Sequence, residues 1–346
     1  MSSVSVVIPC YNYGHFLAEA VRSVLDDQEG VEVRVLIIDD ASSDGSAEVA
    51  RQIAARDPRV EVSVHPANRG HIATYNEGLL EWADCDYTVL MSADDRLTPG
   101  ALRRAADLLD SHPDVGFVYG HPVHFQHGQE PPPARTTVRG WSIWPGQWWL
   151  ERRFRDAHNC ITSPEVVVRT SLQKRVGGYD PSLPHLADAE MWLRLAAYAD
   201  VGYVRGVDQA FYRIHGKNMT KARTQLVDLR QRRLAYEAVL ERCADRLPDA
   251  AHLSEIVRRR LSWEALWSAA RAYDRGRTEQ IPVDDLVAFA FDCWPKAGEL
   301  PVYWGLRLRQ RIGARSMPYL QPFILSAIAR KVENWWWWRS WASRGL

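Results

Sequence analysis

Short hydrophobic runs alternate with helix-like segments through the first third of the chain. The runs are rich in β-branched residues and almost continuously apolar, which is typical of strands buried on both faces of a sheet. They lie at residues 4–8, 33–38 and 87–91, and a weaker run lies at 60–64. Between them, apolar residues recur every three to four positions, as on the buried face of a helix, for example at 16–25 and 72–82. This order predicts an α/β fold with a mostly parallel sheet covered by helices.

The pattern changes after the fourth run. Residues 121–140 are rich in His, Pro, Gly and Gln and predict a loop, and 188–199 predict a helix. Further strand-like runs occur at 165–169, 201–204 and 209–214. From about residue 222 to the end the periodicity is helical, with a break between Pro295 and Pro301. We therefore expect two domains, an α/β domain over 1–220 and a helical region over 221–346.

Charge and cysteine content narrow the functional classes. Lys and Arg together number 43, as do Asp and Glu, so no net basic field points to nucleic acid as a partner. The five cysteines are scattered, without the spacing of a zinc site, which is typical of reduced thiols in the cytoplasm. The N-terminus lacks signal-peptide features, and no apolar run reaches the ~20 residues of a membrane-spanning helix. We expect a cytoplasmic protein that binds no nucleic acid.

Two pairs of aspartates follow two of the predicted strands. Asp39 and Asp40 end the second run, and Asp94 and Asp95 follow the fourth. In open α/β sheets, ligands bind beyond the carboxyl ends of the strands, so both pairs are expected to face one crevice. Adjacent acids repel each other unless a cation offsets their charge, and oxygen ligands suit Mg²⁺ or Mn²⁺. Single acids at strand ends also serve as turn residues or helix caps, but two pairs favour a metal–phosphate site.

The common nucleotide-binding loops are missing from the chain. No GxxxxGK[ST] motif occurs, and no GxGxxG follows the first strand. The first strand leads instead into Pro9, Cys10, Tyr11 and Asn12. This rigid, aromatic turn is suited to stacking on a base or to hydrogen-bonding it.

The chain contains a series of motifs in a fixed order. The first four are VSVVIPCYNYGHFLAEAVRSVL, IIDDASSDGS, NRGHIATYNEGL and MSADDRLTPGAL. The next three are SPEVVVRTSLQKRVGGYD, HLADAEMWLRLA and YRIHGKNMT. In this order they closely resemble the inverting family 2 glycosyltransferases of the GT-A fold. They cover roughly residues 1–220, and so many motifs in one order are not expected by chance. The resemblance implies a Rossmann-like mixed sheet that binds a nucleoside diphosphate sugar.

The resemblance also implies roles for individual residues. It assigns the donor nucleotide to Pro9, Tyr11, Asn12, Asp39 or Asp40, and Asn68. Asp94 would lie near the ribose, and Asp95, with Asp94 beside it, would ligate Mn²⁺ or Mg²⁺. Ser92 stands where the common form of the motif has a further acid, which blurs which aspartate holds the metal. The loop after the last strand closes over the diphosphate in similar enzymes, which gives Arg213 and His215 phosphate contacts. A structural or surface role is the alternative for the lone histidine.

The helix predicted from residue 188 carries the acid that the resemblance implies as the catalytic base. The family has an acidic pair here, and because Ala187 replaces its first member, Asp188 is the candidate. Asp188 shares one helix face with three apolar residues, Met191, Trp192 and Leu195, and so lines up with the buried side. Glu190 lies on another face and pairs with Arg194, as surface residues commonly do. The alternative for Asp188 is a plain helix cap.

These features favour a metal-dependent inverting glycosyltransferase. Two alternatives remain, a sugar nucleotidylyltransferase and a non-catalytic sugar- or partner-binding protein on the same fold. The donor is expected to be a UDP- or dTDP-sugar, and the acceptor a glycan, a lipid-linked glycan or a small molecule. The tryptophans at 141, 144, 148 and 149 are expected to shape the acceptor pocket or to fill the core beneath it.

The end of the chain has an unusual composition. Four of the fifteen tryptophans are consecutive, at 335–338, and basic residues flank them. We expect this cluster to pack within the chain or across a homodimer, since aromatic residues are mostly buried. Peripheral contact with a membrane surface is the alternative, because tryptophan and basic residues together suit the interface.

Overall fold

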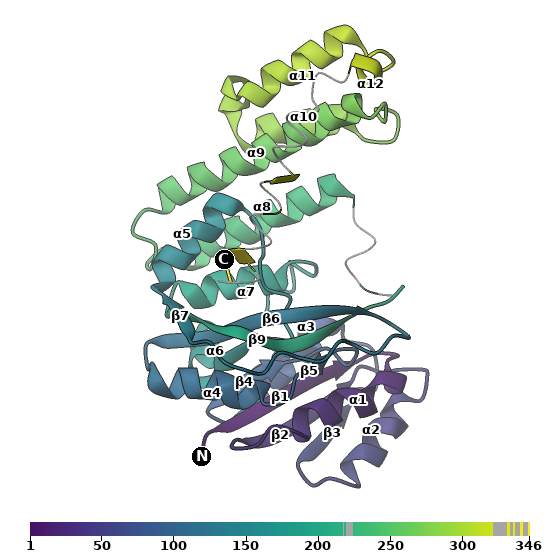
Figure 1. The fold of residues 1–346 in the computed structure, drawn as a ribbon, viewed down its shortest axis with the longest axis vertical. Helices are drawn as coiled ribbons and strands as arrows, with labels where there is room; N and C mark the ends of the chain where they lie inside the picture. The colour runs from purple at the N-terminus through teal and green to yellow at the C-terminus, as the bar shows by residue number, and fades with distance from the viewer. Residues whose placement is uncertain (217, 219–223, 321–330, 333–334, 336–339, 342–344) are drawn as a thin grey trace. The chain divides into compact units, whose positions relative to one another are not determined.

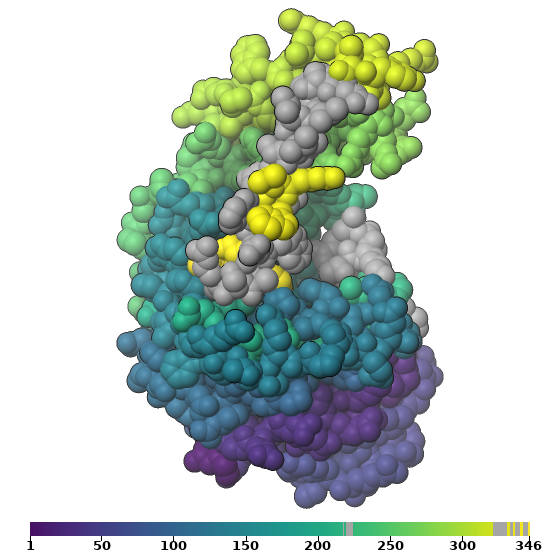
Figure 2. All heavy atoms as spheres, viewed as in Figure 1, coloured from purple at the N-terminus to yellow at the C-terminus, as the bar shows by residue number. Residues whose placement is uncertain are grey.

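The computed structural model describes residues 1–216, 218, 224–320, 331–332, 335, 340–341 and 345–346, and the remainder is grey in Figures 1 and 2. The chain divides into two compact units. The sheet unit comprises Met1–Leu150, Asn159–Lys221 and Trp341–Leu346, and the helical unit comprises Glu151–His158 and Ala222–Ser340. Two short segments, 151–158 and 341–346, thus depart from a single division near residue 220.

Among the described residues, nine strands form one mixed sheet in the sheet unit, in the order β3-β2-β1-β4-β8-β6-β9-β5, with β7 paired to β9 (Figure 1). The parallel part contains β1 Ser3–Cys10, β2 Glu32–Asp39, β3 Val60–Val64 and β4 Tyr87–Leu90. The long strands β6 Val115–Gln126 and β9 Asp200–Ile214 are parallel to each other. The antiparallel strands are β5 Arg96–Leu97, β7 Trp141–Trp144 and β8 Val167–Arg169. The predicted α/β class with a mixed sheet is confirmed.

The prediction of a loop from residue 121 was wrong for its first six residues. Residues 121–126 continue β6 and pair with the end of β9. Their exposure alternates, because Phe125 is buried whereas His124 and Gln126 are exposed. The polar residues on the solvated side broke up the apolar run from which strands are predicted.

Helices pack on the sheet through the apolar faces that the periodicity indicated. In the sheet unit they are α1 Gly14–Leu25, α2 Ser46–Ala54, α3 His71–Asn76, η1 Glu77–Trp82, α4 Ala101–Ser111, α6 Thr170–Val176 and α7 Ala187–Ala196. The buried core joins Val6 and Ile8 of β1 to Leu17 and Val21 of α1. The helix predicted over 72–82 is divided into α3 and a π-helical turn, η1. At Gly78 of η1, an added Cβ would lie 2.3 Å from the Val7 side chain, so only glycine permits this close approach to β1.

The helical unit contains α8 Gln225–Arg242, α9 Ala250–Asp274, α10 Val283–Cys293, η3 Pro295–Glu299, α11 Pro301–Ile312 and α12 Met317–Leu320. The side chains of Thr224 and Asp249 cap α8 and α9 by accepting hydrogen bonds from backbone N–H groups. Helix α5, Gly146–Asp156, contributes its first residues to the sheet unit and its last to the helical unit.

The predicted role of the tryptophan cluster falls mostly outside the described residues. Trp336, Trp337 and Trp338 belong to the undescribed part, whereas Trp335 is described and 52% exposed. No helix within the described ranges combines the length and apolar character needed to cross a membrane.

Candidate functional site

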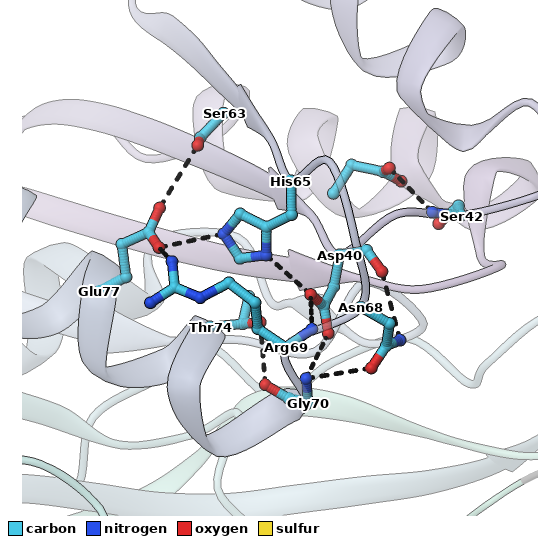
Figure 3. Close-up of polar contacts among 10 residues, drawn as sticks. Asp40, Ser42, Ser63, His65, Asn68, Arg69, Gly70, Thr74 and Glu77 are labelled. Atoms are coloured by element: carbon cyan, nitrogen blue, oxygen red, sulfur yellow. Dashed lines mark hydrogen bonds and ion pairs between the residues drawn. The ribbon is translucent and has the colours of Figure 1, made fainter.

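Asp40 follows β2, and its side chain makes hydrogen bonds to the loop 65–70. Its carboxylate accepts hydrogen bonds from the backbone N–H groups of Arg69 and Gly70 at 2.7 and 2.9 Å and is bonded to the His65 ring at 2.7 Å (Figure 3). The other ring nitrogen of His65 lies 3.0 Å from Glu77. Burial alone would raise the pKa of Asp40, but the hydrogen bonds outweigh it and hold that pKa below its usual range.

Asp39, at the end of β2, has a different environment although its chemistry is the same. The side chain is buried, with a relative exposure of 1%. Oδ1 accepts a hydrogen bond from the Ser42 backbone N–H at 3.0 Å, whereas Oδ2 is buried without any partner among the described residues. A buried acceptor that is left unsatisfied costs free energy. Asp39 therefore offers one oxygen to a donor group that the chain itself does not supply.

The other predicted nucleotide contacts line the same end of the strands. Pro9 is the penultimate residue of β1, and Tyr11 beyond it is 50% exposed. Asn12 adopts a positive φ of 59°, and its Oδ1 accepts from the Ser43 backbone N–H at 2.9 Å. This bond ties the loop after β1 to the loop after β2.

Asn68 also makes contacts within the protein. Its amide donates to the Asp40 carbonyl at 3.2 Å and accepts from the Gly70 N–H at 3.0 Å (Figure 3). Asn12 and Asn68 therefore shape the site through its loops, and Tyr11 presents the exposed ring.

The second pair of aspartates is joined to the end of β9. Asp94 Oδ2 lies 2.8 Å from Nε2 of His215, and Asp95 Oδ1 accepts from the Arg213 backbone N–H at 2.9 Å. Both aspartates are buried. Burial, and then the charge of Asp94, raise the pKa of Asp95 well above its usual value, although the hydrogen bond from Arg213 opposes this shift. The site therefore favours a cation that would offset the two carboxylates.

The Arg213 side chain is buried and largely committed to protein partners. Its Nε donates to the Asp94 carbonyl at 2.8 Å, and Nη2 donates to Glu19 at 2.5 Å. The guanidinium carbon lies 4.6 Å from the ring centroids of both Phe16 and Phe125. Through its hydrogen bond to the Asp94 carbonyl, the Arg213 side chain helps to hold the acidic pair in place. This arrangement points to a positioning role for Arg213.

Asp188 occupies the first turn of α7 and is half-buried. Its Oδ2 accepts a hydrogen bond from the Asn159 amide at 3.1 Å. The apolar residues predicted to share its face are all buried: Met191, Trp192 and Leu195. Asp188 itself is less buried than Glu190, which was assigned to another face, so burial along the helix does not distinguish the two acids.

The predicted pairing of Glu190 with Arg194 is present, but its predicted surface location is wrong. Glu190 is 0% and Arg194 5% exposed, and the two form a bidentate ion pair with both N–O distances at 2.8 Å. Arg194 also donates to the carbonyls of Val176 and Gly178. The pair is buried because the turn after α6 packs here and needs donors for its carbonyl groups.

Two site residues were not predicted from the sequence. Glu165 is 2% exposed, and its Oε1 accepts from the Thr162 N–H at 2.7 Å, while Oε2 is buried without any partner in the described ranges. Burial, with a smaller contribution from the charge of Asp188, raises the pKa of Glu165 to about 7. Glu165 in turn contributes to the raised pKa of Asp95. An acid directly before a buried apolar strand was the available signal in the sequence.

The second of these residues is Tyr75, on α3. Burial raises the pKa of its hydroxyl, and the charges of Asp188, Asp94 and Asp95 raise it further. Its ring contacts Tyr179 edge-on, with centroids 5.7 Å apart. The tyrosine therefore shares its surroundings with the metal-binding and base candidates, which were predicted from separate motifs.

A complete metal cage is not preformed. In the part of the chain that the structure describes, no three His, Cys, Asp or Glu side chains surround a point that could hold a metal ion. Mg²⁺ and Mn²⁺ sites commonly take one or two carboxylates and complete their coordination with phosphate oxygens and water. The carboxylates of Asp94 and Asp95 fit that kind of site.

The tryptophans expected near the acceptor site differ in their surroundings. Trp149 is 1% exposed and belongs to the core, whereas Trp148 is 47% exposed. Trp149 therefore fills the core, and a contribution of Trp148 to the acceptor pocket stays a prediction.

Known proteins are similar to this chain in sequence and in fold. Residues 5–171 match the model of a family described as Glycosyl transferase family 2. The succinoglycan biosynthesis protein ExoA of Rhizobium meliloti is 29% identical over 205 residues, which are 56% of this chain and 58% of that protein. The putative glycosyltransferase EpsE of Bacillus subtilis is 26% identical over 215 residues, or 61% and 72% of the two chains. The matched segments span only 13% to 64% of the first curated relatives' own lengths.

Solved structures show the same fold. Residues 1–349 of S. aureus TarS, crystallised in complex with UDP-GlcNAc, superpose with a TM-score of 0.63 at 17% identity. The match covers 94% of this chain and 92% of the TarS chain. This likeness confirms the predicted GT-A fold.

Proposed function

From the match of residues 5–171 to the Glycosyl transferase family 2 model, we propose that the chain transfers a sugar from a nucleoside diphosphate sugar to an acceptor hydroxyl with inversion. The observation that carries this proposal is that two different sets of acids follow strands of the sheet. Asp39 offers a buried, unsatisfied oxygen, and Asp94 and Asp95 offer a pair of buried carboxylates. In a nucleotide-sugar donor, the base requires a hydrogen-bond acceptor such as the Asp39 oxygen. The diphosphate requires a cation, which the Asp94 and Asp95 carboxylates can hold.

Asp39 is the proposed base-recognition residue, in preference to Asp40. Oδ2 of Asp39 is available, whereas both oxygens of Asp40 already accept hydrogen bonds from the loop 65–70. A single available acceptor matches a base with one ring N–H between two carbonyl groups, which is uracil or thymine. Tyr11 supplies an exposed ring for stacking. A UDP- or dTDP-sugar is therefore the proposed donor, and the UDP-GlcNAc complex of TarS supports this choice.

Asp95 and Asp94 are the proposed residues that hold Mn²⁺ or Mg²⁺. When bound, such an ion neutralises the diphosphate and stabilises the charge that develops on the leaving group. The protein's own contribution is to hold the two carboxylates, with His215 on Asp94 and the Arg213 backbone on Asp95. Burial is the main cause of the raised pKa of Asp95, and a cation here would offset the second cause, the like charge of Asp94.

Asp188 is the proposed general base. As the acceptor oxygen attacks the anomeric carbon, the bond from that carbon to the diphosphate oxygen breaks, and Asp188 takes the hydroxyl proton. The Asn159 amide donates a hydrogen bond to Oδ2 of Asp188 and so fixes the orientation of the carboxylate. Of the acceptor classes, a glycan is supported by the relative that is named for succinoglycan biosynthesis.

The proposal is tested by thermal unfolding in the presence of UDP, dTDP and GDP, each with Mn²⁺ or with EDTA. We expect UDP or dTDP with Mn²⁺ to stabilise the protein, by about 2.7 kcal/mol at a hundred times the Kd. Asp95→Ala should abolish the dependence on Mn²⁺. Hydrolysis of the stabilising nucleotide's sugar conjugate then separates an enzyme from a binding protein. A chain that no nucleotide stabilises, with or without Mn²⁺, would refute the proposal.

A further inference from the structure

The last described residues of the chain are part of the sheet unit. Trp341 is 7% exposed, and its indole Nε1 donates a hydrogen bond to the Cys160 carbonyl at 2.7 Å. The indole ring also lies 5.1 Å from the ring of His121 on β6. In Figure 2, atoms of the C-terminal residues (yellow) lie against the blue-green atoms of the sheet unit. The indole thus packs against the sheet and satisfies a backbone acceptor.

A second anchor holds the same end of the chain. The Gly345 carbonyl accepts a hydrogen bond from the Tyr119 hydroxyl. Gly345 has a φ of 81°, and an added Cβ would lie 2.4 Å from the Tyr203 ring. Only glycine adopts this conformation so close to an aromatic ring. The contacts of Trp341 and Gly345 therefore describe a specific docking of the C-terminus.

The first anchor leads directly to the proposed base. Cys160 follows Asn159, whose amide nitrogen donates to Asp188 Oδ2 at 3.1 Å. The amide oxygen of Asn159 accepts from the Ile161 N–H at 3.0 Å. The asparagine is therefore oriented by the backbone on the far side of Cys160. The carbonyl between these two contacts is the one that Trp341 holds.

We propose that Trp341 is a positioning residue for Asp188, which acts through the Cys160 carbonyl and the Asn159 amide. This inference rests on the proposed function, because it presumes that Asp188 is the base. A buried carbonyl that loses its donor costs free energy, so without the indole N–H the segment around Cys160 shifts to find another partner. Such a shift turns Asn159 away from Asp188, and small misplacements of a base reduce the rate strongly.

The donor site lies outside this chain of contacts. Asp39 and Asp95 are held by Ser42 and Arg213, and neither contact involves the C-terminal residues. Loss of the Trp341 hydrogen bond should therefore lower kcat and leave donor binding unchanged. A general loosening of the fold would instead weaken both.

The test uses Trp341→Phe in the full chain, which keeps an aromatic ring and removes the N–H. We expect kcat to fall about tenfold while the Kd for the nucleotide, measured by thermal shift with Mn²⁺, stays within about twofold of wild type. The matched control is Trp304→Phe on α11, where the side chain is 68% exposed and both constants should be unchanged.

A double-mutant cycle with Asp188→Asn compares kcat in the single and double variants. This comparison distinguishes an effect through Asp188 from a purely structural effect of Trp341. If Trp341 acts through Asp188, Trp341→Phe should cost nothing further in kcat once Asp188 is replaced. The inference would be overturned if the losses of kcat from Trp341→Phe and Asp188→Asn were additive in the double variant. It would also be overturned if Trp341→Phe alone had the kcat of wild type. Failure of the proposed function is distinct from both, since the wild-type chain would then neither bind nucleotide nor transfer sugar.

Discussion

Asp39 and Asp40 are adjacent in the sequence and chemically identical, yet hydrogen bonding gives them different capacities. Asp40 accepts two backbone N–H bonds and contacts His65, so its charge is already stabilised by the fold. Asp39 has one buried oxygen that no described group satisfies. A residue's place in a motif therefore does not decide its role, and the partners that the loops provide do.

This difference predicts opposite effects of two matched substitutions. Asp40→Asn removes the charge that Arg69, Gly70 and His65 stabilise, and hydrogen bonds to charged groups contribute about 1.5–3 kcal/mol each. We expect it to lower the melting temperature. Asp39→Asn should keep the melting temperature and lose the stabilisation by UDP or dTDP, because an amide group presents both a donor and an acceptor to the base. Thermal unfolding with and without nucleotide measures both effects, and the reverse pattern would assign the base to Asp40.

At the scale of elements, helix α7 carries the proposed base beside a buried ion pair. Its first turn contains both Asp188 and Glu190, and Glu190 pairs with Arg194 one turn further along. Asp188→Asn should reduce kcat by about 10²–10⁴-fold with little change in unfolding, because it removes a general base. Glu190→Gln should leave kcat per folded molecule unchanged but cost about 3 kcal/mol, because it leaves a buried guanidinium without its counter-charge.

Steady-state kinetics, combined with denaturant unfolding of the same preparations, distinguishes these outcomes. Lys174→Gln, which alters an exposed cation on α6, is a suitable control for handling and should match wild type in both measurements. A large loss of kcat in Glu190→Gln at full stability would move the base to Glu190.

The elements that the sequence predicted are those whose residues carry their own pattern. Strands β1, β2 and β4 are largely apolar runs, β3 alternates apolar and polar residues, and α1 and α7 have apolar faces at helical spacing, so local periodicity locates them. Strands β5 and β7 depend on pairing with β9, which is distant in sequence, and they have no such pattern.

The same limit applies to the site. Motifs located the acids at Asp39, Asp95 and Asp188, but the hydrogen bonds that distinguish neighbouring acids come from separate loops. Glu165 was missed because its burial is set by the folded chain and not by its neighbours in sequence.

At the scale of the whole molecule, positive and negative residues are equal in number, whereas acidic residues are concentrated in the candidate site. Lys and Arg together number 43, as do Asp and Glu. In the site, however, the charges of Asp94 and Glu165 raise the pKa of Asp95, and the charge of Asp188 raises the pKa of Glu165. Folding a neutral chain thus creates a locally acidic region. Its free-energy cost must appear in the pH dependence of stability.

Glu165 gives that dependence a direction. Its pKa is raised from 4.5 to about 7 in the folded protein, so the folded state disfavours its charge. Below pH ~4.5 the carboxyl is protonated in both states and costs nothing. As the pH rises towards 7, the unfolded chain ionises first, and stability falls by roughly 3 kcal/mol. Above that range the loss is complete and constant.

Glu165→Gln removes this contribution because glutamine does not titrate. Urea unfolding at pH 5 and pH 8 should show a smaller loss of stability for the variant than for wild type. Asp95 remains in both proteins, but its raised pKa depends in part on the charge of Glu165, so the difference between them reports Glu165 together with its effect on Asp95. Glu81→Gln is the matched control, since Glu81 is exposed and should leave the wild-type dependence unchanged. Equal losses in wild type and Glu165→Gln would show that Glu165 is ionised in the folded protein throughout this range, stabilised by a partner within the site.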